Sequence, residues 1–199
     1  MIEIIELEKK FDDLKLFDKF NLMIEDGDYI CISGESGKGK TTLLNMIGHI
    51  EPYDKGKILI DGREIIKSKD ILEFFRKKIG FLFQNYVLAE DKTVKQNLEL
   101  IRKQDRTEYS IKEILKKLGL EDKLNSKVYT LSGGEQQRVA MARLYLKECK
   151  YILADEPTGS LDKKNSDIII NILEDLNKEG KTIILVTHDD YIKNKAKRS

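Results

Sequence analysis

The sequence has little that would direct it to a membrane or to a nucleic acid. None of its apolar runs approaches the roughly 20 residues that cross a bilayer, and Met1-Ile2-Glu3 opens the chain without a signal-peptide pattern. The 36 Lys and Arg residues are balanced by 35 Asp and Glu residues, so the net charge is only +1. We therefore expect a soluble, cytoplasmic protein with no nucleic-acid partner, whose membrane role would come through another subunit.

Cysteine and proline are also scarce. Cys31 and Cys149 sit in or beside apolar runs and have no metal-ligating neighbour at a useful spacing, so we expect two small core residues in a reducing compartment. With two prolines, no internal repeat and no long linker, the 199 residues suit one domain that has a full core and room for a subdomain.

One run of eight residues fits the pattern G-x-x-x-x-G-K-[ST], in which a loop wraps the phosphates of a nucleotide. Gly34 and Gly39 let the backbone turn tightly and approach phosphate oxygens without a Cβ clash, and successive N–H groups form an anion nest at a helix start. Lys40 reaches the β- and γ-phosphates, and the Thr41 hydroxyl is placed to ligate Mg²⁺. The run is Gly34-Glu35-Ser36-Gly37-Lys38-Gly39-Lys40-Thr41.

The context of this loop favours phosphate binding over an ordinary Gly-rich turn. Residues 29–33 indicate a buried strand and residues 42–47 a helix, which is the strand–loop–helix setting that the motif requires. The loop alone indicates a nucleotide and leaves open what the nucleotide is used for.

Strand and helix patterns alternate around this loop. Strands are predicted at residues 2–4, 20–24, 57–60, 63–65, 79–83, 151–154 and 182–186, with Asp61-Gly62 as a hairpin turn. The period is helical from about 93 to 147, and a further helix from about 164 to 178 is ended by Gly180. This order predicts an α/β fold with a mainly parallel sheet and an inserted helical subdomain.

Two carboxylates end the apolar strand at residues 151–154. Asp155 at the carboxyl end of a buried strand beside a phosphate loop can hold Mg²⁺, directly or through water. The adjacent Glu156 can polarise a water for in-line attack on the γ-phosphate. A strand that ends in Asp-Glu is common at surface turns, and it is the pairing with the loop that favours the catalytic interpretation.

A second glycine pair opens a later helix, in Leu131-Ser132-Gly133-Gly134-Glu135-Gln136-Gln137-Arg138. It predicts a second anion-binding helix start, and the alternative is a capped helix with Ser132 as the cap and Glu135 three residues on. One domain has no obvious need for two phosphate sites. Two copies that face each other do, because the second site of one can complete the first site of the other.

The motifs follow one another along the chain in the order found in ATP-binding cassette (ABC) proteins. The chain resembles the nucleotide-binding domain of these proteins over almost its whole length. Residues 34–41 are similar to Walker A, 152–156 to Walker B with its catalytic glutamate, and 131–136 to the family signature, with Glu135 where many members have Gln. The resemblance implies one P-loop NTPase domain over 1–199 with an N-terminal antiparallel β subdomain. Its core would span about 1–92 and 148–199, and its helical signature subdomain about 93–147.

The resemblance also implies a role for individual residues. Glu156, the switch histidine His188 and the Q-loop glutamine Gln84 would be catalytic, and Thr41, Gln84 and Asp155 would hold Mg²⁺. The residues expected to bind ATP are Phe11, which would stack on adenine, then Gly34, Glu35, Ser36, Gly37, Lys38, Gly39, Lys40, Thr41 and Thr42, the signature residues Ser132, Gly133 and Gly134, and Asp162 of the D-loop Ser160-Leu161-Asp162.

The family pattern implies an ATPase that powers transport through a separate integral membrane permease at the inner face of the cell membrane. Two copies would sandwich two ATP–Mg²⁺ between Walker A of one and the signature of the other. Residues 45–48 and 155–162 are similar to the exporter-type branch, with its lipoprotein-release, macrolide-export and antimicrobial-peptide transporters. Short length and general similarity extend this to ATPase subunits of bacteriocin export systems of the lactococcin 972 group, which implies a peptide or similar amphipathic substrate.

Two other functions compete with this one. A soluble cassette protein of translation or DNA repair would usually join two cassettes or carry long coiled-coil insertions, and neither is visible. A nucleotide-gated assembly module that does not hydrolyse ATP is disfavoured by the set of Asp155, Glu156 and His188.

Three features leave alternatives open. Lys38 replaces the small residue usual inside the loop, and it can fold toward the phosphates or face solvent. Tyr86, Val87 and Leu88 suit a contact with the membrane subunit as well as subdomain core. The sequence stops eleven residues after His188, where most members continue, which fits a naturally short branch or a truncation.

Overall fold

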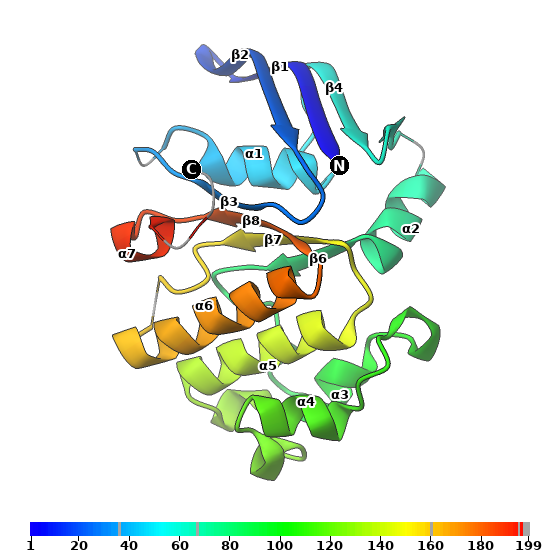
Figure 1. The fold of residues 1–199 in the computed structure, drawn as a ribbon, viewed down its shortest axis with the longest axis vertical. Helices are drawn as coiled ribbons and strands as arrows, with labels where there is room; N and C mark the ends of the chain where they lie inside the picture. The colour runs from blue at the N-terminus through cyan, green and yellow to red at the C-terminus, as the bar shows by residue number, and fades with distance from the viewer. Residues whose placement is uncertain (36, 67, 160, 195, 197–199) are drawn as a thin grey trace.

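The chain forms two sheets that lie on either side of helix α1 (Lys40–Ile47). The computed structural model describes residues 1–35, 37–66, 68–159, 161–194 and 196. The antiparallel sheet has the strand order β2 (Leu14–Ile24), β1 (Ile2–Phe11), β4 (Lys55–Ile60) and β5 (Arg63–Glu64), and the parallel sheet β3 (Tyr29–Ile32), β8 (Thr182–Val186), β7 (Tyr151–Asp155) and β6 (Ile79–Leu82). Figure 1 shows the antiparallel sheet above α1 and the parallel sheet below it. The predicted α/β fold is confirmed.

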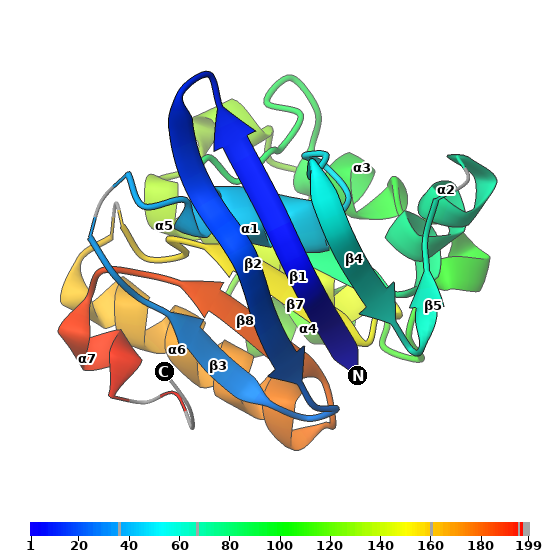
Figure 2. The same ribbon diagram turned by 90° about the horizontal axis from the view of Figure 1, so that it is seen from above.

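Helices cover the other face of the parallel sheet. In Figure 1, α5 (Gly133–Leu146) and α6 (Lys163–Lys178) lie below this sheet, with α3 (Val94–Glu99) and α4 (Ile111–Lys117) beyond α5. Viewed from above, β1, β2 and β4 cross over α1 (Figure 2). The remaining elements are α2 (Ser68–Lys77), α7 (Asp190–Lys193) and the 3₁₀ turns Lys103–Asp105, Glu121–Lys123 and Val128–Thr130.

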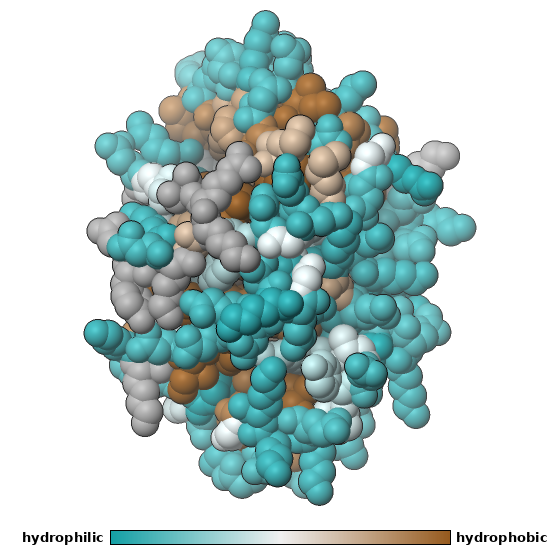
Figure 3. Space-filling model, in the orientation of Figure 1, coloured by the Kyte–Doolittle hydropathy of each residue, from teal (hydrophilic) through white to brown (hydrophobic). Residues whose placement is uncertain are grey.

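Two hydrophobic clusters fill the layers on the two faces of the parallel sheet. Along β8, Ile183 and Leu185 pack into the cluster with α5 and α6, whereas Ile184 and Val186 pack into the cluster with α1. Burial on both faces is why this strand is apolar at consecutive positions rather than at alternate ones. Cys31 and Cys149 are buried, as predicted. Figure 3 shows a mostly polar surface, with apolar side chains gathered toward the top, over the antiparallel sheet.

Turn and cap residues set the element boundaries. Asp61 and Gly62 both have a positive φ (52° and 74°), as a two-residue hairpin of type I′ requires, and they join β4 to β5. Gly119, with φ at 64°, follows the C-cap of α4 and ends that helix. No element is predicted at residues 66–78, where the structure has α2, which packs against β6 and buries Phe74.

The parallel sheet brings separate motifs to one edge. Because β3, β6, β7 and β8 all run in the same direction, the loops that follow them leave from the same edge of the sheet. In Figure 1 the starts of α1, α5 and α6 and the short α7 lie on the left side of the molecule. Within the described ranges, no helix combines the length and the apolar character needed to cross a bilayer.

Candidate active site

The glycine-rich loop between β3 and α1 closes on its own lysine. Gly37 and Gly39 have positive φ angles of 78° and 84°, which residues with a Cβ rarely adopt. The Lys40 ammonium donates to the carbonyl oxygens of Gly34 (2.8 Å) and Glu35 (2.7 Å). A cation that rests on two carbonyls is poised to exchange them for phosphate oxygens. Ser36, also predicted to bind the nucleotide, lies outside the described residues.

Asp155 ends β7 directly beside this loop. The Thr41 hydroxyl donates to Asp155 Oδ1 at 3.1 Å, so the hydroxyl and the carboxylate predicted to hold Mg²⁺ adjoin each other. Burial raises the pKa of the Asp155 carboxyl, and the charge of Glu156 raises it further, against the hydrogen bond from Thr41. A desolvated carboxylate next to a hydroxyl is a set of oxygen donors that suits Mg²⁺, which supplies the missing positive charge.

Glu156 is held in place from three directions. Its backbone has φ at 44°, a strained value, and its N–H donates to the Val186 carbonyl at 2.9 Å. The Thr187 hydroxyl donates to Oε2 at 3.1 Å, and His188 Nδ1 lies 2.8 Å from Oε1. An ionised carboxylate can only accept, so Nδ1 carries the proton in this contact. The His188 side chain is 76% exposed and that of Glu156 18%, so the pair is open to solvent on the histidine side.

Two cavities meet at Glu156. The first cavity measures about 430 Å³ and lies between the phosphate loop and the residues around Phe11 and Glu156. Its lining residues are Gly37, Gly39, Lys40, Thr41 and Thr42 on the loop side, and Phe11, Leu14, Leu16, Glu156 and Val186 on the other side. Phe11 is 45% exposed, with the Lys9 ammonium 4.5 Å above its ring. The second cavity, of about 480 Å³, is lined by residues that include Gly159, Thr187 and His188. Phe11 and Thr42, distant in sequence, thus face one space beside the loop.

Gln84 and Lys38 lie at the periphery of this arrangement. Gln84 follows β6 and is exposed, and its Nε2 atom lies 3.6 Å from where a Cβ on Gly159 would be. In the described part of the chain it forms no hydrogen bond to Thr41 or Asp155. Lys38 faces solvent, with its side chain 70% exposed and its ammonium 3.7 Å from the Glu35 carboxylate.

The second glycine pair sits at the start of α5, which Ser132 caps. The Ser132 hydroxyl accepts from the Glu135 N–H, and the Glu135 carboxylate accepts from the Ser132 N–H at 2.8 Å. That backbone hydrogen bond lowers the pKa of Glu135. The capped helix predicted as the alternative is thus present, and it leaves the anion-binding interpretation open. None of Ser132, Gly133 and Gly134 lines the cavity beside the phosphate loop.

The start of α5 is tied to the start of α6. Asp162 caps α6 by accepting from the Asn165 N–H at 2.9 Å, and the Asn165 amide donates to the same carboxylate at 2.7 Å. A Cβ on Gly134 would lie only 2.9 Å from Asn165 Oδ1, so a side chain at this position would displace the Asn165 amide. Arg138 donates to the same oxygen at 2.7 Å. Ser160, of the predicted D-loop, lies outside the described residues.

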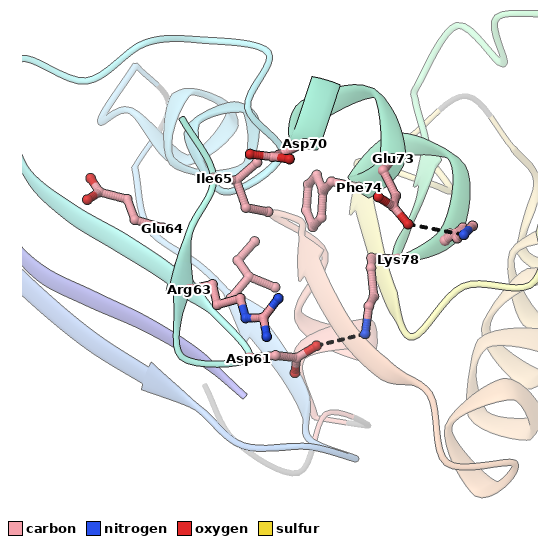
Figure 4. Close-up of a pocket in the computed structure, with 10 residues that line it drawn as sticks. Asp61, Arg63, Glu64, Ile65, Asp70, Glu73, Phe74 and Lys78 are labelled. Atoms are coloured by element: carbon pink, nitrogen blue, oxygen red, sulfur yellow. Dashed lines mark hydrogen bonds and ion pairs between the residues drawn. The ribbon is translucent and has the colours of Figure 1, made fainter. Parts of the chain in front are cut away.

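A larger cavity than the two that meet at Glu156 lies elsewhere in the molecule. It measures about 570 Å³ and lies between the β4–β5 hairpin and α2, with the Asp61–Lys78 ion pair at one side (Figure 4). None of the predicted site residues lines it, so volume alone would misplace the site. Thr187, which donates to Glu156, is a site residue that the motifs do not predict. Its position directly before His188 is the one signal for it in the sequence.

A strand–loop–helix phosphate loop with an adjoining Asp-Glu pair defines a P-loop nucleotide-binding protein. A family model described as "ABC transporter" matches residues 17–159, and the chain belongs to this family. It is accordingly an ATPase with ATP and Mg²⁺ as cofactors.

Relatives from several bacteria agree with this membership. The chain is 42% identical to "Lipoprotein-releasing system ATP-binding protein LolD" of Leptospira interrogans, over 99% of this chain and 86% of that protein. It is 41% identical to "Macrolide export ATP-binding/permease protein MacB" of Aggregatibacter actinomycetemcomitans, over 100% of this chain. It spans only 32% of the length of that MacB protein. The predicted likeness to lipoprotein-release and macrolide-export proteins is confirmed.

Solved structures share the whole fold. The dimeric structure of MJ0796, described as a bacterial ABC transporter cassette, has a TM-score of 0.88 and 35% identity, over 98% of this chain and 91% of that one. A dimeric post-hydrolysis structure of MJ0796 bound to ADP and Pi has a TM-score of 0.85 and 33% identity, over the same shares.

Proposed function

We propose that this chain is the ATPase subunit of an exporter and that it powers transport through a separate membrane permease. The observation that carries the proposal is the pair of contacts at the edge of the parallel sheet, Thr41 with Asp155 and Glu156 with His188. These four residues come from the start of α1, the end of β7 with the residue after it, and the loop after β8. They comprise a metal ligand set, a base and an imidazole. This set is what phosphoryl transfer from ATP to water needs.

Each residue takes one role in that reaction. Lys40 leaves the carbonyls of Gly34 and Glu35 and binds the β- and γ-phosphates, and Thr41 and Asp155 hold the Mg²⁺ that neutralises developing charge. Glu156 accepts a proton from the attacking water. His188, which Glu156 holds through Nδ1 in the nucleotide-free protein, turns its ring N–H to the γ-phosphate when ATP binds.

Further residues complete the nucleotide site. Phe11 stacks on the adenine, and the loop N–H groups from Gly34 to Thr42 hold the phosphates. Gln84 would serve as a further oxygen ligand for Mg²⁺ once the site closes. The Lys38 ammonium leaves the Glu35 carboxylate and contacts the phosphates. Its side chain is exposed, so it has room to make this movement.

We propose a homodimer as the hydrolysing species. Support comes from the signature residues Ser132, Gly133 and Gly134, which lie apart from the cavity of their own phosphate loop, and from the dimeric structures of the similar MJ0796. The signature of one copy would close the ATP site of the other, with Asp162 carried along through Asn165. Only ATP, with its γ-phosphate, bridges the two halves, so hydrolysis releases the dimer.

The chain would work at the inner face of the cell membrane, held there by its permease. We propose the division into a core of about 1–92 and 148–199 and a helical subdomain of about 93–147. Val87 is 52% exposed, whereas Tyr86 and Leu88 are partly buried against the core, so the membrane contact would centre on Val87. The relatives named for lipoprotein release and macrolide export fit an amphipathic substrate. A peptide or bacteriocin stays a prediction.

Two measurements test this function. Purified protein should release phosphate over many turnovers with Mg²⁺-ATP, and Lys40→Ala should abolish this release. Release of at most one phosphate per chain would instead favour the nucleotide-gated assembly module. Isolation of the tagged chain from membranes should yield a protein with several membrane spans in stoichiometric amount. Recovery of the chain in the soluble fraction without that partner, at full ATPase activity, would favour a soluble cassette protein.

A further inference from the structure

The chain takes a strained turn immediately after Gln84. Tyr86 and Val87 have positive φ angles of 59° and 47°, and a β-branched residue such as Val87 is an outlier there. The Val87 N–H donates to the Asn85 carbonyl at 2.6 Å, which makes a three-residue turn around Tyr86 in the strained form of the γ-turn. Such a conformation persists only where the surroundings hold it.

Arg143, in the last turn of α5, holds this turn. Its Nη2 donates to the Tyr86 carbonyl and its Nη1 to the Val87 carbonyl, both at 2.6 Å. The two donors of a planar guanidinium therefore fix two successive carbonyls in a way that a single ammonium cannot. Burial lowers the pKa of Arg143, so its charge, desolvated in this place, is compensated by these backbone dipoles.

The other end of the segment is fixed as well. The fully buried Asn97 of α3 donates to the Ala89 carbonyl at 3.0 Å and accepts from the Ala89 N–H at 2.8 Å. The stretch from Tyr86 to Ala89 is therefore held at both ends by helices. The exposed Val87 belongs to the first attachment, through its carbonyl.

The Tyr86 side chain leads from this turn to the signature. Its hydroxyl lies 3.6 Å from where a Cβ on Gly133 would be, at the first residue of α5, and its ring packs against the hydrophobic cluster of that helix. Since α5 has 14 residues, it is about 21 Å long. Arg143 near one end and Gly133 at the other are thus both linked to the same turn.

We propose that Arg143 is a positioning residue: it fixes the Tyr86–Val87 turn so that Gln84 is presented to the nucleotide site while Tyr86 is held against Gly133. This deepens the proposed function and rests on it. A displacement of Val87 by a membrane partner then moves Gln84 and the signature helix together, because the turn between them is clamped to that helix. Without the clamp, the two would move independently.

The test compares Arg143→Met with Lys147→Met. Lys147 directly follows α5, and its half-buried ammonium donates to the Phe75 carbonyl of α2, away from the Gln84 loop. Both variants should lose similar thermal stability. Arg143→Met should lower kcat at least tenfold while the Kd of Mg²⁺-ADP stays within threefold, and Lys147→Met should keep kcat within twofold. Arg143→Lys, which retains the charge, should have a kcat between those of Arg143→Met and the wild type. It replaces Arg143→Met in the comparison if that variant does not fold.

Combination with Gln84→Ala separates the possible failures. If Arg143 acts in part through Gln84, Arg143→Lys lowers kcat by a smaller factor in Gln84→Ala than in the wild type. Equal kcat losses in Arg143→Met and Lys147→Met, or an unchanged kcat in Arg143→Lys and Arg143→Met, would overturn the positioning role while leaving the function of Gln84 intact. An unchanged kcat in Gln84→Ala alone would instead contradict the proposed site, and the route through Arg143 with it.

Discussion

Replacing Glu156 with glutamine should stop hydrolysis and leave the site otherwise intact. Glutamine has the same shape, so it can occupy the same strained backbone position at φ 44°. Its amide oxygen can accept from Thr187, as Oε2 does now at 3.1 Å, and its NH₂ can donate to the ring nitrogen of His188 that now lies 2.8 Å from Oε1. Both contacts of the folded protein therefore survive, whereas the group that accepts a proton is lost.

The expected size of the effect follows from that loss alone. A positioned general base is worth about 10²–10⁴ in rate, or about 2.7–5.4 kcal/mol at 1.36 kcal/mol per tenfold change. Multi-turnover phosphate release should fall by this factor, while ATP affinity stays within about threefold and unfolding free energy within about 1 kcal/mol. The exposed Glu121→Gln serves as the charge-matched control. A kcat within tenfold of wild type would refute the assignment of Glu156 as the base.

Three further predictions concern the ionised and the tightly packed residues. Burial raises the pKa of Asp155 above 3.8, so the nucleotide-free protein loses stability as the pH rises through that raised pKa. Asp155→Asn should therefore have a higher Tm than the wild type at pH 7 without nucleotide, and a lower Tm would contradict this. Mg²⁺-ATP at 100 times its Kd should raise the unfolding free energy of the wild type by about 2.7 kcal/mol, and Asp155→Asn should lack this gain. Burial opposes ionisation of Asp61, but hydrogen bonds from Lys150, Tyr151 and Lys78 outweigh it and lower the pKa. The contribution of the Asp61 carboxylate to folding stability is therefore present above pH 3.8 and is lost as the pH falls through the lowered pKa. Asp61→Asn should lower the unfolding free energy measured in urea at pH 7 by about 2 kcal/mol. The control Asp122→Asn, at an exposed position, should lower it by less than about 0.5 kcal/mol. Gly48→Ala should cost roughly 1–3 kcal/mol by overpacking, because its Cβ would lie 2.1 Å from the Phe81 ring; unchanged urea unfolding would show that the ring moves freely.

Local signals predicted much of the fold. Asp61-Gly62 and Gly119 have the backbone conformations that their sequence contexts require, and the apolar strands at 151–154 and 182–186 lie in the parallel sheet. Helix α2 was missed because its ten residues bury little beyond one aromatic face, at Phe74. The antiparallel strands β1 and β2 extend well beyond the predicted segments, since their outer halves pair through register shifts and carry no alternating pattern.

The site was predictable as a set of motifs, and its geometry was not. The spacing of Lys40, Asp155 and His188 in the sequence says nothing of which side chains touch. The contacts of Thr187 with Glu156 and of Asn165 with Asp162 depend on how strands and helices meet in three dimensions. Nothing in the sequence around Arg143 marks a guanidinium that binds carbonyls more than 50 residues away.

The mass of the Glu156→Gln variant in solution tests the central claim, that ATP joins two copies through the signature, most directly. With Mg²⁺-ATP the mass should rise from the 23.0 kDa of one chain to twice that value, and with Mg²⁺-ADP it should stay at one chain. Adding Ser132→Arg should keep the protein at one chain with ATP present, while ATP affinity of the single chain is retained. A mass that does not change with ATP, or a dimer that forms equally with ADP or with Ser132→Arg, would contradict the shared site.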